Sequence, residues 1–150
     1  DSNMSKFINM IDRFRIMPVI NGGKSLIQPV NARDLGKAFY TVLMTPDRTE
    51  DKAYDLSGEK PLQMIEVFKL ISNNLNKKTN FVNVPLGFGV FLARAAKLLT
   101  IGKIDYVEKV QRIGEDRSYS HEDATRDFDY EPMSFEEGIQ IEVKQYLKSI

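Results

Sequence analysis

The sequence predicts an α/β chain that is mostly helical and carries only a few short strands. Three observations predict this class. Apolar residues recur at three- and four-residue spacing along several long segments, which is typical of amphipathic helices. Short apolar runs bounded by Gly, Pro or Asn lie between these segments and have the length of strands. The apolar fraction of 42% in 150 residues is enough to build the core of one domain.

The first two helices are predicted from their apolar stripes and their end signals. One covers residues 3–15. Its stripe consists of Met4, Phe7, Ile8 and Ile11. The next helix begins after Asn31, which can cap it, and Asp34 suits its positive first turn. Pro46 is expected to end it.

The second half of the chain is expected to be largely helical. Helices are predicted over residues 64–75, 86–99, 106–113 and 123–128. The segment 86–99 is the most apolar, but glycines, Arg94 and Lys97 interrupt it, so we expect a buried helix and not a membrane span. Ser134 and Glu137 form a capping box, which predicts the start of the last helix.

Short strands are expected between the helices. Residues 17–20 lead into Asn21-Gly22-Gly23, and residues 25–30 follow, which predicts a β-hairpin. Further strands are predicted at 53–56 and 81–84. Their alternation with helices indicates pieces of a parallel sheet, yet two short strands cannot form a stable sheet alone. The topology therefore looks incomplete.

Composition excludes several classes of function. The 21 basic and 21 acidic residues balance, which argues against a nucleic-acid partner. The absence of cysteine excludes disulfides, thiolate nucleophiles and cysteine zinc sites. No charged-then-apolar leader opens the chain and no apolar run is long enough for a membrane span. We therefore expect a cytoplasmic protein without a membrane partner.

No complete active site is found in the sequence. Gly22-Gly23 is followed by an extended segment, so it lacks the helix N-terminus that holds a pyrophosphate. His121 is the single histidine, and a polar turn explains it more simply than a metal site does. Ser120 is adjacent to it and is not placed for a catalytic triad. We expect no catalytic residue and no metal ligand in this chain.

Four ordered segments together resemble a known family. Residues 18–23 with 28–38 are similar to the "G-G … hV-x-D-x-A" segment of extended short-chain dehydrogenases. Residues 53–59 resemble their "Y-N-L-x-G" strand, and 81–85 their strand leading into "VP". Residues 123–138 resemble their closing "l-G-y-x-P-x-s-f-e-e-G" signature. The resemblance covers nearly the whole chain and points to the NAD-dependent epimerase/dehydratase group, which acts on nucleoside-diphosphate sugars, or to its atypical relatives.

The resemblance implies a division of the complete protein. In this family an N-terminal Rossmann-type domain carries the Gly-rich NAD(P) turn and a Tyr-x-x-x-Lys pair. No tyrosine of this chain has lysine four residues later, so both elements are expected outside it. Residues 1–150 would be one C-terminal, substrate-side domain, in which 32–58 resemble the last helix and strand of the absent dinucleotide-binding sheet. NAD or NADP would bind the complete protein and not this chain.

The resemblance also suggests substrate-side residues. They are Asn3, Pro18, Ile20, Gln28 and Arg117. Asn3 matches the asparagine that opens the substrate-side helix, Pro18 and Ile20 the strand against the nucleotide base, and Arg117 an arginine that grips the diphosphate. A second phosphate arginine of the family falls on Ile27 or Gln28, and Asp129 stands where glycine is usual. Core packing explains Pro18, Ile20 and Ile27 equally well.

Two functions follow as alternatives. The chain is the substrate-binding part of an NAD(P)-dependent epimerase, dehydratase or reductase, with a small molecule such as a nucleotide sugar as its ligand. Alternatively, it belongs to a non-catalytic relative that senses cofactor or scaffolds a complex. The coding sequence upstream of Asp1 discriminates between them, because only the enzyme needs the Tyr-x-x-x-Lys pair. In either case the isolated chain is expected to self-associate, since the partner domain would leave apolar surface bare.

Overall fold

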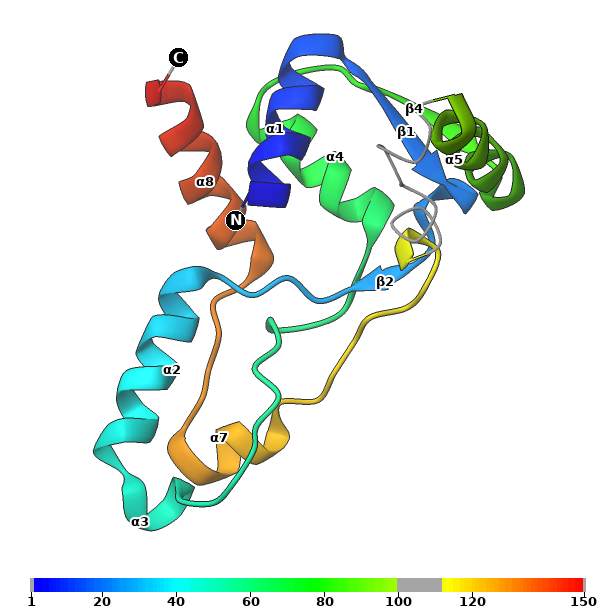
Figure 1. Cartoon of the computed structure of the whole chain (residues 1–150). Coiled ribbons are helices and arrows are strands. Elements are labelled where there is room, and N and C mark those ends of the chain that lie inside the picture. The colour runs from blue at the N-terminus through cyan, green and yellow to red at the C-terminus, as the bar shows by residue number, and fades with distance from the viewer. Residues whose placement is uncertain (1, 100–111, 150) are drawn as a thin grey trace.

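A computed structural model describes residues 2–99 and 112–149 and confirms the predicted class, because helices dominate and the strands are short (Figure 1). In chain order its elements are α1 (Ser2–Phe14), β1 (Ile16–Ile20), the 3-10 turn η1 (Asn21–Gly23), β2 (Leu26–Ile27), α2 (Ala32–Met44), α3 (Pro46–Thr49), β3 (Leu62–Gln63), α4 (Met64–Asn74), β4 (Asn80–Val84), α5 (Leu86–Leu99), α7 (Glu122–Phe128) and α8 (Phe135–Ser149). The predicted helix 106–113 lies almost wholly outside the described residues.

The strands pair in two small sheets. β1 and β4 are parallel, in a register that runs from Ile16 opposite Asn80 to Ile20 opposite Val84. β2 and β3 are antiparallel, with Leu26 opposite Gln63. Both pairs join segments that are far apart in sequence, because 35 or more positions separate the strands of each pair.

The predicted hairpin over residues 17–30 is wrong, because β1 pairs with β4 and β2 pairs with β3. The positive φ angles expected of the turn are present at Asn21, Gly22 and Gly23. The turn is held by the end of β4, since the Gly22 N–H donates to Asn83 Oδ1 at 2.7 Å. The chain therefore continues toward α4 and does not return along β1.

The predicted strand at 53–56 is also wrong, since this segment is extended but belongs to no sheet of the described chain. The Tyr54 side chain of this segment contacts α7 instead. The Tyr54 ring packs edge-on against Phe128 at 5.0 Å between centroids, and its hydroxyl donates to Asp127 at 2.9 Å. The partner of β4 in a parallel pair is thus β1, not this segment.

The predicted helix caps are confirmed, but the sequence analysis missed the start signals of α3 and α4. Asn31 caps α2 by accepting from the Arg33 N–H at 2.9 Å, and Ser134 with Glu137 caps α8 as expected. Pro46 both ends α2 and opens the single turn α3, because proline fits the first position of a helix. Gln63 and Glu66 form a second capping box at α4.

The helix α5 is confirmed, but the expectation that it is buried is not. Phe88 is 55% exposed and Phe91 is 64% exposed. No helix of the described residues is both long enough and apolar enough to cross a membrane.

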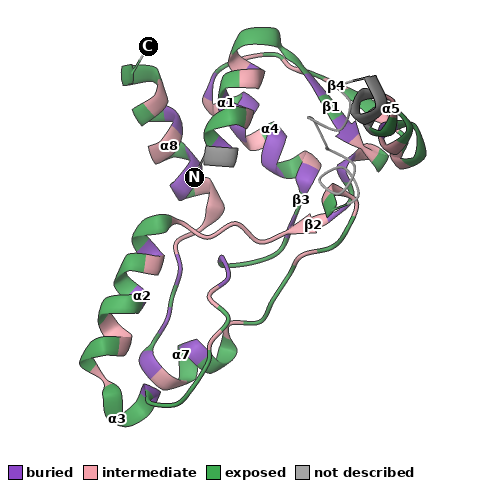
Figure 2. Cartoon of the chain, viewed as in Figure 1, coloured by how far each residue is buried: buried purple, intermediate pink, exposed green. Residues whose placement is uncertain are grey.

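Two hydrophobic cores divide the molecule, and extended segments connect them (Figures 1 and 2). The larger core lies where α1, β1, α4 and α8 meet, and Ile8, Ile11 and Ile71 are among its most buried members. The smaller core joins α2 to α7 through Ala38 and Phe128. One side of α2 remains exposed in Figure 2. The extended connections between the cores form the walls of the site described next.

Candidate functional site

A cleft of about 620 Å³ lies beside the N-terminal half of α1, where the extended connections between the two cores run past it. It is lined by Met4, Phe7, Ile27, Gln28, Pro29, Asp55, Leu56, Ser57, Met64, Arg112, Ile113, Arg117 and Tyr119. Two of the predicted site residues, Gln28 and Arg117, therefore lie in one cleft although 89 positions separate their numbers in the sequence. Its charged lining residues are Arg112, Arg117 and Asp55.

Backbone contacts position Arg117 in the cleft wall. Its N–H donates to the Leu26 carbonyl at 2.8 Å, and it forms an isolated parallel bridge with Ile27. The Leu26 N–H in turn donates to Asp116 Oδ1 at 2.8 Å. These two contacts hold the segment at Asp116 and Arg117 beside β2, which fixes where the arginine side chain leaves the backbone.

The Arg117 guanidinium is only partly satisfied. Its Nη2 donates to the Arg112 carbonyl at 3.1 Å. Its Nε is buried and has no hydrogen-bond partner, and no carboxylate of the described residues pairs with it. A buried donor without an acceptor costs free energy, and a charged one costs more. The arrangement favours an anionic group in the cleft.

Gln28 connects the segments beside Arg117. Its Nε2 donates to the Gly58 carbonyl at 2.7 Å, and its Oε1 accepts from the Tyr119 N–H at 3.0 Å. Gly58 itself has no room for a side chain, because a Cβ there would lie 2.1 Å from the Pro29 carbonyl oxygen. Both ends of the Gln28 amide are occupied, so it orders three segments of the cleft in this structure.

A second polar group, around Ser57, lies at the edge of the cleft. The Ser57 hydroxyl donates to the Tyr119 carbonyl at 2.8 Å and contacts His121 Nδ1 at 2.9 Å. The tautomer of His121 decides which of the two atoms donates in this second contact. Ser120 takes no part in either contact.

Tyr130 contacts both Ser57 and His121. Its hydroxyl donates to the Ser57 carbonyl at 3.0 Å, and its ring lies edge-on to His121. Burial, and secondly the nearby Asp34 carboxylate, raise the pKa of Tyr130 to about 12. The phenol is therefore a permanent hydrogen-bond donor at neutral pH and not an acid–base group.

An apolar slot of about 190 Å³ adjoins the cleft. Pro18 and Ile20 line it, together with Phe7, Met10, Met17, Gly23, Ser25, Met64, Phe68 and Ile113. Phe7, Met64 and Ile113 line both spaces, so the two are neighbours. The slot brings the predicted residues Pro18 and Ile20 next to the cleft that holds Gln28 and Arg117. Asn3 lies in α1 beside Met4 of the cleft, but its side chain is outside the described residues.

Sequence reasoning missed several lining residues. Tyr119 and Arg112 flank Arg117 in the segment after the undescribed residues, and no periodic pattern distinguishes them there. Asp55 and Ser57 were expected in a strand and a turn of another sheet, so their place in the cleft could not be foreseen. The spacing of two arginines five positions apart was the only available signal.

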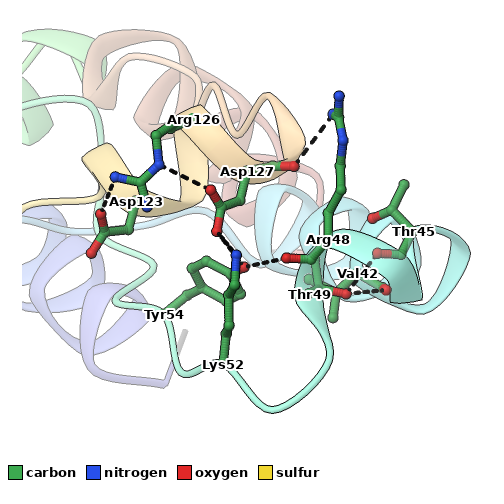
Figure 3. A network of polar contacts seen from close by, with 9 residues as sticks. All are labelled: Val42, Thr45, Arg48, Thr49, Lys52, Tyr54, Asp123, Arg126 and Asp127. Carbon is green, nitrogen blue, oxygen red and sulfur yellow. Dashed lines mark hydrogen bonds and ion pairs between the residues drawn. The ribbon is translucent and has the colours of Figure 1, made fainter.

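A separate ionic network lies away from the cleft and connects the loop after α3 with α7 (Figure 3). Asp127 accepts from Lys52 Nζ at 2.7 Å, from the Tyr54 hydroxyl at 2.9 Å and from Arg126 Nε at 3.0 Å. These donors, Lys52 first, hold the pKa of Asp127 well below its usual range. None of these residues lines the cleft, so the network stabilises the smaller core.

The described residues do not fit a dinucleotide or a metal ion. The Gly22 N–H is engaged by Asn83, and the turn leads into β2 and not into a helix whose N-terminus could face a pyrophosphate. Within residues 2–99 and 112–149 no group of three or more His, Asp or Glu side chains is placed to hold a metal ion.

No family model matches the sequence, and no curated protein matches it. Solved structures do match. The crystal structure of gox2253 aligns with a TM-score of 0.70 at 13% identity, over 97% of this chain and 43% of that one. RMD from Pseudomonas aeruginosa, complexed with NADPH, aligns at 0.65 with 11% identity, over 99% and 42%. The dTDP-glucose 4,6-dehydratase (rfbB) of Bacillus anthracis, in complex with NAD, aligns at 0.65 with 19% identity, over 97% and 39%.

These alignments show the fold. The chain has the architecture of the C-terminal portion of Rossmann-like, NAD(P)-binding enzymes, which is the predicted fold class. It spans roughly two-fifths of the length of each matched protein, as the coverage of 43%, 42% and 39% states.

Proposed function

We propose that this chain is the substrate-binding, C-terminal portion of an NAD(P)-dependent epimerase, dehydratase or reductase. The fold supports this, because the matched proteins include a dehydratase and two of the three structures contain NAD or NADPH. The cofactor would supply hydride transfer in the complete protein, and this chain would bind and orient the substrate. We expect no catalytic group in this chain, since the Tyr-x-x-x-Lys pair of the resembled family would lie in the rest of the complete protein.

The observation that carries the proposal is the Arg117 guanidinium, which has no carboxylate partner among the described residues, in a cleft of about 620 Å³. Arginine is suited to carboxylate and phosphate groups, because its planar donors match two acceptor oxygens. A cleft of this volume is typical of small-molecule sites. A nucleotide sugar is the substrate class that the family resemblance implies, with Arg117 toward the diphosphate, Gln28 in the wall and Asn3, Pro18 and Ile20 nearby.

The test is the substitution Arg117→Ala in the complete protein. A charge-assisted contact is worth about 1.5–3 kcal/mol, so the dissociation constant of an anionic substrate should rise about tenfold or more. Calorimetric titration with UDP- and dTDP-sugars measures it. Arg33→Ala is the matched control, because Arg33 is an exposed arginine of α2 outside the cleft. An unchanged constant for Arg117→Ala would assign this arginine a structural role.

One observation favours the non-catalytic alternative, a cofactor sensor or scaffold. The second phosphate arginine that the family resemblance implies falls on Ile27 or Gln28, and neither is an arginine here; Ile27 packs against the larger core. An isoleucine cannot pair with a diphosphate. The sequence of the complete protein decides: a Gly-rich turn with a Tyr-x-x-x-Lys pair supports the enzyme, and a Gly-rich turn without that pair supports the sensor. Steady-state turnover of NAD(P)H with candidate substrates provides the independent measurement.

A further inference from the structure

The apolar slot beside the cleft has walls that suit hydrocarbon and offer almost nothing to a polar group. Met17 and Phe68, on β1 and α4, are 2% and 3% exposed, and they form its base. Ser25 is the one lining residue among those described that has a polar side chain. A ligand group that enters this slot is therefore surrounded by carbon and sulfur atoms.

Several backbone groups around the slot are already engaged or absent. Pro18 has no N–H, and β1 forms its ladder with β4. The Ser25 carbonyl accepts from the Met64 N–H at 3.0 Å, and the Gly22 N–H beside it donates to Asn83. A nucleobase carries several ring and exocyclic polar atoms, and Ser25 is the one described side chain of the slot that could replace the water they would lose. This argues against a base as the occupant.

The size of the slot sets the size of the apolar group. Its volume is about 190 Å³. Dry cavities of about 150 Å³ lined by aliphatic and aromatic side chains bind benzene, so one ring or a short hydrocarbon chain fits. Because the slot shares Phe7, Met64 and Ile113 with the cleft, one ligand can occupy both spaces.

We propose that the ligand of this site is an amphipathic anion: its carboxylate or phosphate pairs with Arg117, and an aromatic ring or short hydrocarbon chain occupies the slot. This inference rests on the proposed substrate-binding function of the cleft, and it replaces the nucleotide sugar that the family resemblance implies with a different substrate class. Ile27, also in the cleft wall, agrees with it, since an apolar residue there suits the hydrocarbon part of such a molecule.

Binding of a homologous series to the complete protein tests the inference. Straight-chain carboxylates from butyrate to decanoate are titrated alongside UDP and dTDP. Each added methylene should tighten binding about fourfold until the slot is full, and the longer carboxylates should exceed both nucleotides. Arg117→Ala should weaken every carboxylate by about the same factor, so that the dependence on chain length remains.

Two variants of Ile20 separate the contribution of the slot to binding from that of the cleft. Ile20→Trp fills the slot and Ile20→Asn adds a polar group to it, and both should abolish the dependence on chain length. Leu147→Trp, at a half-exposed position of α8 that lines neither space, is the matched control and should leave the dependence intact. Circular dichroism verifies that each variant is folded. Affinity independent of chain length, or tighter binding of UDP than of decanoate, overturns the inference. If Arg117→Ala weakens binding in that case, the proposed function stands; if it has no effect on any anion, the proposed function fails too.

Discussion

Asp129 follows α7 in the left-handed conformation, with φ 55° and ψ 41°. Its N–H completes the helix end by donating to the carbonyls of Ala124 and Thr125. Glycine is the usual residue at such a position, because a Cβ raises the energy of the left-handed region. The family resemblance also places glycine here, and the backbone explains why. The departure is therefore conformational and carries no information about the ligand.

We expect Asp129→Gly to stabilise the protein by about 0.5–1 kcal/mol, because it removes the steric cost of positive φ. Urea unfolding followed by circular dichroism measures the change. Asp129→Ala serves as the control, since it removes the carboxylate but keeps the Cβ. If alanine stabilised the protein as much as glycine, charge and not backbone conformation would be the cause.

Asp127 makes the stability of the smaller core depend on pH in the acidic range. Its folded-state pKa lies well below the ordinary aspartate value because of Lys52, Tyr54 and Arg126. A depressed pKa contributes stability that is complete above the unfolded value of about 3.9 and is lost as the pH falls below it. The melting temperature should therefore drop between pH 5 and pH 3, and Asp127→Asn should reduce that drop. Asp47→Asn, on the exposed surface of α3, should leave the drop unchanged.

At the scale of elements, the turn η1 needs glycine for two reasons: a positive φ at both positions and a lack of space for a side chain at Gly23. Gly22 and Gly23 have φ angles of 69° and 68°. A Cβ on Gly22 would meet no atom within 4 Å, whereas a Cβ on Gly23 would lie 2.9 Å from Ile65 and Val19. Gly23 thus permits the close approach of β1 to the start of α4.

Alanine at the two positions separates these demands. Gly22→Ala should cost about 1–2 kcal/mol, the price of the left-handed region alone. Gly23→Ala should cost that amount and about 1–3 kcal/mol more, because the added methyl group overpacks the contact with α4. Chemical unfolding of both variants gives the comparison. Equal losses would show that the backbone conformation matters and the packing does not.

Local signals predicted the elements well and their pairing poorly. The caps Asn31 and Ser134 were evident from the sequence, because a cap bonds to residues two or three positions away. The Asn21-Gly22-Gly23 turn predicted a hairpin from equally local chemistry, but the side chains of Asn21 and Asn83 bind the turn to the end of β4. Contacts 61 and 65 positions apart leave no periodic trace in the sequence.

The candidate site is likewise formed by long-range contacts that the sequence does not reveal. Arg117 was predicted only through the resemblance, and the structure places it with Gln28 in one cleft. The bridge between Ile27 and Arg117 and the Tyr119 contact to Gln28 bring these segments together. Neither contact has a sequence signature, so the composition of the cleft required the fold.

At the scale of the whole molecule, α2 has an unpartnered apolar side. Ala38 and Val42 face the smaller core, but on the other side Phe39 is 63% exposed and Leu43 is 78% exposed. Tyr40 and Met44 are exposed beside them. Contiguous apolar surface of this kind marks an interaction site. The matched proteins are more than twice as long as this chain, and the resemblance places residues 32–58 against their dinucleotide-binding sheet.

The 150-residue chain should therefore self-associate through α2. Covering one such side chain contributes about 1.5–3 kcal/mol, so several together drive association at micromolar concentration. Light scattering should give a mass above that of the monomer, and Phe39→Ser with Leu43→Ser should return it to the monomer value. Phe14→Ser with Phe91→Ser is the matched control, because both phenylalanines are as exposed but lie outside α2. A monomeric unmodified chain would contradict the prediction, since α2 would then tolerate water on its apolar side without a second domain.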